Sequence, residues 1–255
     1  MSTYLEAVRT IYPGAVSTHD GTAWLLAFLR ERFGMEPHQV MFADSLCSDD
    51  LNQIEYPKLA FEMLGPFKLG GLNGFPFAGL TGMGAFAHHV PADGAVFAFY
   101  GPHIGITKDG TPGKVLRAGQ TTPSLCCGAA QGALLKLQRG EIRPGEVTEL
   151  DYQMNQIEQI FLRQESRILG AEVPIVAATE VMYEATAERI RTLVDHTKYP
   201  CRYVVLMGAI LINGDHGAGS FACMRNPNIL DSQADSCENA LEQYWQVARA
   251  NGAVV

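Results

Sequence analysis

The sequence predicts an α/β fold, a three-layer sandwich in which helices cover both faces of a central, largely parallel sheet. Strand-like runs alternate along the chain with segments of helical periodicity, and the runs at 95–100 (AVFAFY) and 203–213 (YVVLMGAILIN) are almost wholly apolar. A strand without polar alternation is buried on both faces, as inside a parallel sheet covered by helices. No repeat or linker divides the 255 residues, so we expect a single domain over residues 1–255.

The individual elements follow from apolar spacing and from polar or glycine residues at their ends. Helices are expected at 1–14, 18–34, 126–140, 148–169, 176–197 and 238–251, with another that follows a glycine-rich loop within 71–90. Strands are expected at 39–47, 95–100, 104–107, 114–120 and 203–213. The glycine-rich loop lacks both the G-x-G-x-x-G spacing and a lysine, which argues against a phosphate-binding loop.

Composition excludes several classes of protein. The formal net charge of −8 argues against a nucleic-acid partner, which would require a basic patch. No apolar run reaches the roughly 20 residues of a membrane span, and the first residues lack the apolar centre of a signal peptide. We therefore expect a cytoplasmic protein whose six cysteines are free thiols or metal ligands. A 47% hydrophobic content with only 18% charged residues also indicates a large subunit interface.

Four residues that carry metal-binding chemistry lie where strands end or a helix begins: Cys47, His103 and the adjacent pair Cys126 and Cys127. The ends of strands are where an open α/β sheet places its ligand site. Two thiolates and one imidazole are a donor set that favours zinc, and three protein ligands are typical of catalytic zinc. Each cysteine taken alone would more often be a small buried side chain. Together they predict a zinc site.

A carboxylate stands two residues after the first thiol, in the unit Cys47-x-Asp49. Such a carboxylate can accept a hydrogen bond from metal-bound water or can itself bind the metal. β-Carbonic anhydrases contain this unit as C-x-D-x-R, followed by a histidine and a Cys-Gly pair. Here Leu51 stands at the arginine position, and the distance from His103 to the next cysteines is too long. The chain is therefore not an ordinary β-carbonic anhydrase.

The central part of the chain, about residues 40–140, resembles the limiting-carbon-dioxide-inducible B (LCIB) family, which includes theta-type carbonic anhydrases. The matching segments are LCSDD at 46–50, LTGMGAFAHHVPADG at 80–94, YGPHIGI at 100–106, GKVLRAGQ at 113–120 and CCGAA at 126–130. The resemblance implies a β-carbonic-anhydrase-like fold, a homodimer, and Zn2+ held by a Cys-His-Cys set. The implied activity is the reversible hydration of carbon dioxide to bicarbonate through a zinc-bound hydroxide.

Carried across residue by residue, the resemblance makes Cys47 and His103 two of the zinc ligands. The third is Cys126 or Cys127: the Cys-Gly pair of β-carbonic anhydrases favours Cys127, the family's spacing favours Cys126, and the sequence leaves both open. The resemblance makes Asp49 a gate and a hydrogen-bond acceptor.

An arginine from elsewhere must hold Asp49 away from the metal, because an aspartate pKa near 3.9 is too low for protonation to release it. Arg117 is the candidate, acting through a two-nitrogen charge-assisted pair. An ordinary surface arginine is the alternative for Arg117, and Lys58 or Lys114 would then hold the gate.

His88 and His89 are candidates for moving the released proton, since imidazoles titrate near neutral pH, or they simply end a helix. The alternative to an enzyme is a catalytically silent zinc-containing scaffold of a carbon-concentrating system. A zinc deaminase is excluded, because H-x-E and C-x-x-C are both absent. Residues 145–255 carry no matched motif, although Asp215 and His216 follow a predicted strand and are of interest for that reason.

Overall fold

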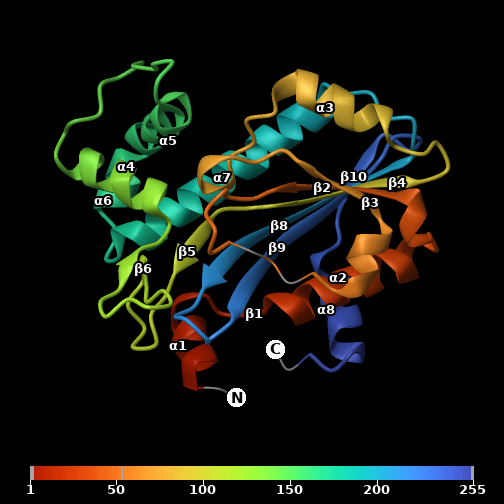
Figure 1. Cartoon of the computed structure of the whole chain (residues 1–255). Helices are drawn as coiled ribbons and strands as arrows, with labels where there is room; N and C mark the ends of the chain where they lie inside the picture. Colours follow the sequence, from red (N-terminus) through yellow and green to blue (C-terminus); the bar gives the residue numbers. More distant parts are fainter. Residues whose placement is uncertain (1–2, 53, 55, 254–255) are drawn as a thin grey trace.

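A single eight-stranded sheet forms the middle of the molecule, and helices cover both of its faces (Figure 1). The structure, a computed structural model, describes residues 3–52, 54 and 56–253. The sheet strands are β1 (Val16–Ser17), β2 (Val40–Ser45), β3 (Leu64–Lys68), β4 (Ala95–Tyr100), β5 (His103–Gly105), β8 (Tyr203–Asn213), β9 (Ser220–Asp231) and β10 (Ser236–Asn239). A separate ribbon pairs β6 (Lys114–Val115) with β7 (Ser124–Leu125).

The strand order is β1-β9-β8-β4-β2-β3, with β10 added on β9 and β5 added on β8. The pairs β3–β2, β2–β4, β4–β8 and β5–β8 are parallel, whereas β9 is antiparallel to each of its neighbours. The predicted α/β class with a largely parallel central sheet is therefore confirmed.

The helices divide between the two faces of the sheet (Figure 1). They are α1 (Thr3–Ile11), α2 (Thr18–Phe33), α3 (Gly79–His88), α4 (Gly128–Gln138), α5 (Tyr152–Arg163), α6 (Glu165–Leu169), α7 (Pro174–Asp195) and α8 (Leu241–Ala250), with short 3-10 turns η1 (Pro37–Gln39), η2 (Lys58–Glu62) and η3 (Leu72–Gly74). One core joins α1, α3, α4, α5, α6 and α7 to the sheet, and the other joins α2 and α8 to its opposite face.

Strand β8 shows why an uninterrupted apolar run belongs at the centre of this sheet. Its residues alternate between the two cores: Val204, Leu206, Ile210 and Ile212 pack on the α7 face, and Val205, Met207, Ala209 and Leu211 pack on the α2 face. Successive side chains of a strand point to opposite faces, so both sets must be apolar when both faces are covered.

The step from β4 to β5 explains the unusual Gly-Pro-His sequence. β4 pairs with the first half of β8 and β5 with the second half, so the chain follows one neighbour across a break at Gly101 and Pro102. A Cβ at Gly101 would lie 1.7 Å from the carbonyl oxygen of Ala209, and the backbone φ there is +158°. Only glycine allows so close an approach. Because Pro102 lacks an N–H, it contributes only its carbonyl, which accepts the Leu211 N–H at 3.0 Å.

Several predicted boundaries are wrong. The expected strand at 114–120 is limited to Lys114–Val115, because the chain then turns, with the Gln120 N–H bonded to the Arg117 carbonyl. The expected helix at 148–169 is divided into α5 and α6 at Gln164, whose backbone is not helical. The strands β1, β3, β7, β9 and β10 are not predicted from the sequence. Strand β9 pairs antiparallel with β8 and has polar residues in its middle that are not fully buried. It therefore lacks the continuous apolar run by which the other long strand is predicted.

Within the described residues, none of the helices has the length and apolar character needed to span a bilayer.

Candidate metal centre

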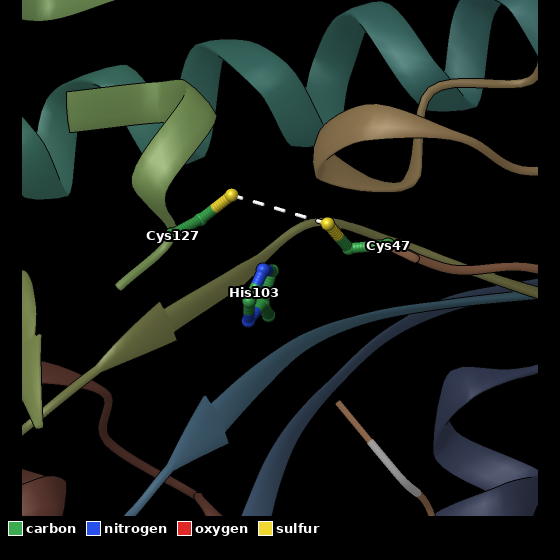
Figure 2. Close-up of side chains that lie close together, drawn as sticks. All are labelled: Cys47, His103 and Cys127. Carbon is green, nitrogen blue, oxygen red and sulfur yellow. Dashed lines mark hydrogen bonds between the residues drawn. The ribbon is translucent and has the colours of Figure 1, made fainter. Parts of the chain in front are cut away.

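Three side chains converge at the carboxyl-terminal edge of the parallel strands. Cys47 follows β2, His103 opens β5, and Cys127 immediately precedes α4. One ligand atom from each, two sulfurs and a ring nitrogen, lie within 4.8 Å of one another, and all three residues are buried. Figure 2 shows the two sulfur atoms pointing toward each other with the imidazole beside them. Cys47 and Cys127 are 80 residues apart in the sequence. The parallel pairing of β2, β4 and β8 places the carboxyl ends of these strands next to one another.

The adjacent thiols Cys126 and Cys127 have different neighbours, although both are buried. The Cys127 sulfur is 4.0 Å from the Cys47 sulfur. The Cys126 sulfur lies 3.7 Å from Nδ1 of His103 and 3.6 Å from Oδ1 of Asn213. Cys127 is therefore the member of the pair that joins the cluster with Cys47 and His103, and Cys126 lies outside it.

The two thiols of the cluster differ in acidity. The pKa of Cys127 is lowered, first by the hydrogen bond from Cys47 and further by the backbone N–H groups of Ala130 and Ala129 in the first turn of α4; burial opposes them. The same Cys47–Cys127 bond, with burial, raises the pKa of Cys47 to about 12. The contact between the two sulfurs therefore shifts their pKa values in opposite directions, with Cys127 the more acidic thiol. The Asn73 N–H also points at the Cys47 sulfur at 3.1 Å.

His103 is wholly buried, and its two ring nitrogens have different surroundings. Nδ1 is 2.6 Å from Oδ1 of Asn213, whereas Nε2 is buried and has no hydrogen-bond partner among the described residues. Burial alone would lower the pKa of the imidazole, but contacts with the Cys126 and Cys47 thiols outweigh it and raise the pKa well above its usual value. An orphaned buried nitrogen beside two thiols is the arrangement expected of a metal ligand.

Asn213 is a site residue that the sequence analysis did not identify. It is the last residue of the strand predicted at 203–213, and it is the only polar side chain after Tyr203 in that run. A polar residue that is buried at the carboxyl end of a central strand is the signal that would have found it.

Asp49, two residues after Cys47, forms an ion pair with Arg117, and its carboxylate is not part of the Cys47, His103 and Cys127 group. Nη2 of Arg117 donates to Oδ1 of Asp49 at 3.1 Å, and Nη1 donates to Oδ1 of Asp50 at 2.7 Å. The guanidinium therefore bridges two carboxylates with one nitrogen each, instead of gripping Asp49 with two. Its pKa is raised, chiefly by the hydrogen bond to Asp50, and the pKa of Asp50 is lowered by the same bond.

The two lysines considered as alternatives do not take this position. Within the part of the chain that the structure describes, neither Lys58 nor Lys114 forms an ion pair with Asp49.

His88 and His89 lie toward the amino-terminal ends of the parallel strands, opposite the ends that carry the cluster. They end α3, are exposed, and precede the turn where Asp93 contacts Gln39, next to the start of β2. The six residues of β2 rise about 3.3 Å each, which puts roughly 20 Å between that turn and the edge that carries Cys47. This chain does not bring the two histidines together with the cluster.

The donor set fits zinc. Two sulfurs and one imidazole nitrogen are ligands that zinc prefers, and a three-residue set leaves one tetrahedral position for water or substrate. Nε2 of His103 is buried without a hydrogen-bond partner among the described residues, and the lowered pKa of Cys127 makes that thiol easier to deprotonate, as a zinc ligand must be.

The comparisons with known proteins identify the family of this chain. The sequence pattern of a family described as limiting CO2-inducible proteins B/C beta carbonic anhydrases matches residues 16–231, and the chain belongs to this family. The crystal structure of PtLCIB4, a homolog of the limiting CO2-inducible protein LCIB, is similar with 27% identity and a TM-score of 0.79, over 92% of this chain and 98% of that one. A point mutant of PtLCIB4 gives 28% identity, a TM-score of 0.80, and coverage of 93% and 98%.

LCIB itself shares the fold, with 17% identity, a TM-score of 0.67, and coverage of 90% of this chain and 95% of that chain. Among curated proteins we found no match.

Proposed function

We propose that this protein is a zinc-dependent carbonic anhydrase that catalyses the reversible hydration of carbon dioxide to bicarbonate. The observation that carries the proposal is the Cys47, His103 and Cys127 cluster, with an ion pair between Arg117 and Asp49, which is only two residues along the chain from Cys47. Family membership supports the substrate class. When bound, zinc would supply a Lewis acid that lowers the pKa of water to about 7.

Each residue of the cluster has a proposed part. Cys47, Cys127 and Nε2 of His103 would hold the metal. Asp49 would orient the reacting water: the Leu51 N–H at 3.0 Å and Arg117 at 3.1 Å both bond its Oδ1, which fixes the carboxylate and would leave its second oxygen to accept a hydrogen bond from that water. A carboxylate without these donors would compete with water for the metal.

Arg117 removes one reason for expecting a silent scaffold. The missing arginine after Asp49 in the sequence weakened the case for catalysis. Arg117, 68 residues further along the chain, supplies a guanidinium to that carboxylate, and its side chain is only 28% exposed. A partly buried, charge-assisted bond of this kind is stronger than one between surface groups. The ion pair therefore favours an enzyme.

Stopped-flow measurement of carbon dioxide hydration tests the function. Zinc-loaded protein should accelerate hydration well above the buffer rate, and protein stripped by a chelator should lose the acceleration and regain it with added zinc. A fully zinc-loaded protein with no rate above buffer would identify a silent scaffold.

Two further proposals concern the assembly. We propose that the whole chain forms one domain, since the sheet takes strands from residue 16 to residue 239. We also propose a homodimer, which the exposed apolar side chains of Phe61 (71% exposed) and Leu150 (100% exposed) support. Light scattering after size-exclusion chromatography should give twice the 27.7 kDa chain mass.

A further inference from the structure

We infer that Asn213 is a positioning residue that fixes the proton of His103 on Nδ1 and couples this ligand to the gate carboxylate of Asp49. The inference rests on the proposed zinc site and goes beyond it, since it assigns a role to the part of the chain without a recognised motif. Asn213 ends β8 and is buried.

The neighbours of the Asn213 amide determine its orientation, and the Cys126 thiol, 3.6 Å from Oδ1, also donates to the oxygen end. Nδ2 of Asn213 lies 2.9 Å from the backbone carbonyl of Leu51, and Oδ1 lies 2.6 Å from Nδ1 of His103. A carbonyl oxygen only accepts hydrogen bonds, so the amide must present its NH2 group to Leu51. The oxygen then faces His103.

The amide orientation in turn determines the tautomer of His103. Because Oδ1 of Asn213 only accepts, Nδ1 of His103 must carry a proton and donate it. In the neutral ring, Nε2 is then unprotonated, and its lone pair is available where the structure leaves that nitrogen without a partner among the described residues. A ligand histidine whose other N–H is held in this way is oriented and made more basic.

The Asn213 side chain is also connected to the Asp49 carboxylate, through Leu51. Asn213 donates to the Leu51 carbonyl, and the Leu51 N–H donates to Oδ1 of Asp49, which also accepts from Arg117. Two sets of hydrogen bonds, joined through the backbone of Leu51, therefore connect the imidazole with the carboxylate. Displacing Asn213 would affect both the ligand and the gate.

The residues after Asn213 bond to the backbone next to Arg117, the partner of Asp49. Oδ1 of Asp215 accepts the Leu116 N–H at 2.7 Å, and its Oδ2 accepts the Lys108 N–H at 2.9 Å. The His216 N–H donates to the Leu116 carbonyl at 2.8 Å. Leu116 immediately precedes Arg117, so residues 213–216 contact the histidine ligand and the backbone on both sides of the Asp49–Arg117 pair.

Asparagine is suited to this position because it offers one acceptor and one donor on a short side chain. Asn213→Leu removes both groups at similar volume. Asn213→Asp keeps the acceptor for His103 but turns an oxygen toward the Leu51 carbonyl, which breaks only the link to the gate. Asn155→Leu is the matched control: Asn155 is also buried and bonded on both amide atoms, but to Thr148 and Glu158, which lie outside the cluster.

The test combines zinc affinity with the position of the proton. Competition against a chromophoric chelator gives the affinity, and long-range 1H–15N correlation spectra of the zinc-loaded protein show which nitrogen of His103 is protonated. We expect the wild type to carry the proton on Nδ1. Asn213→Leu should weaken zinc binding about 10- to 100-fold, whereas Asn213→Asp should bind zinc within about threefold of the wild type and shift the amide signals of Leu51 and Asp49.

Two results would overturn the inference: a wild-type proton on Nε2, or a zinc affinity of Asn213→Leu equal to that of Asn155→Leu. If Asn213→Leu does not fold, Asn213→Asp decides, because unshifted Leu51 and Asp49 signals would remove the link to the gate. None of these measurements depends on hydration activity. A protein that binds zinc but does not hydrate carbon dioxide would contradict the proposed function and leave this test intact.

Discussion

The central segment at 40–140 and the end of β8 contribute differently to the same site. The central segment supplies the three side chains that we propose as zinc ligands and both members of the Asp49–Arg117 pair. The end of β8 and the turn that follows it supply none of these, but Asn213 bonds to the histidine and Asp215 bonds to the backbone beside Arg117. The proposed ligands and the Asp49–Arg117 pair thus lie in recognisable motifs, while the groups proposed to orient them come from a segment without one. Substitutions in the two regions should therefore have different effects.

The largest effect is expected from the three ligands of the central segment. A structural zinc site with four ligands binds the metal with a free energy of about 10–16 kcal/mol, which is about 2.5–4 kcal/mol for each ligand. Loss of one ligand should therefore lower the affinity roughly 100- to 1,000-fold. Cys47→Ser, Cys127→Ser and His103→Ala should each weaken zinc binding by about this factor, measured by chelator competition. Full zinc retention in any of them would remove that residue from the ligand set.

Arg117→Ala should separate activity from metal binding. The variant should keep its zinc and lose hydration activity by a factor on the order of 100, the cost of removing one preorganised donor. Stopped-flow assays at matched zinc content measure the loss. Arg167→Ala is the control, since Arg167 pairs with Glu184 on the surface between α6 and α7. Near-normal activity of Arg117→Ala would mean that the arginine is structural and that another group holds Asp49.

Zinc affinity should increase with pH. The pKa of Cys47 is raised to about 12, so near neutral pH its thiol is protonated in the metal-free protein and must lose that proton on binding. Each released proton strengthens apparent binding about tenfold per pH unit until the pH reaches the pKa of the group. Chelator competition from about pH 6 to 8 measures the slope. An affinity independent of pH would show that Cys47 is already a thiolate or is not a ligand.

The smallest effect is expected at Cys126. Its sulfur faces Nδ1 of His103 and Asn213, so Cys126→Ser should change zinc affinity by no more than about threefold, well below the loss expected for a ligand. Cys127→Ser provides the comparison, because the two residues are adjacent and equally hidden from solvent. A large zinc loss in Cys126→Ser with little in Cys127→Ser would reverse the assignment of the pair.

The sequence was sufficient to propose those site residues whose chemistry depends only on residue type. Cys47, His103 and the thiol pair could be recognised because few roles suit buried thiols and a histidine at strand ends. Arg117 could be proposed because the carboxylate of Asp49 needs a cation, and the structure brings the two side chains together. The α/β class followed from the apolar run of β8, which the two covered faces of the sheet explain.

What could not be predicted depends on where side chains point and on which strands pair. The choice between Cys126 and Cys127 depends on the backbone at the start of α4, which turns one sulfur toward Cys47 and the other toward Asn213. Asn213 becomes important only because parallel pairing places β5 against the end of β8. The position of His88 and His89 follows from the direction of α3, which runs away from the edge that carries the cluster.

X-ray absorption at the zinc edge tests the central claim most directly, because it counts the atoms that bind the metal. Zinc-loaded wild type should show two sulfurs at about 2.3 Å and one imidazole nitrogen at about 2.0 Å, with a light fourth ligand. Cys126→Ser should give the same spectrum, and Cys127→Ser should show one sulfur fewer. Three sulfurs in the wild type, or the loss of a sulfur in Cys126→Ser, would contradict the assignment of zinc to Cys47, His103 and Cys127.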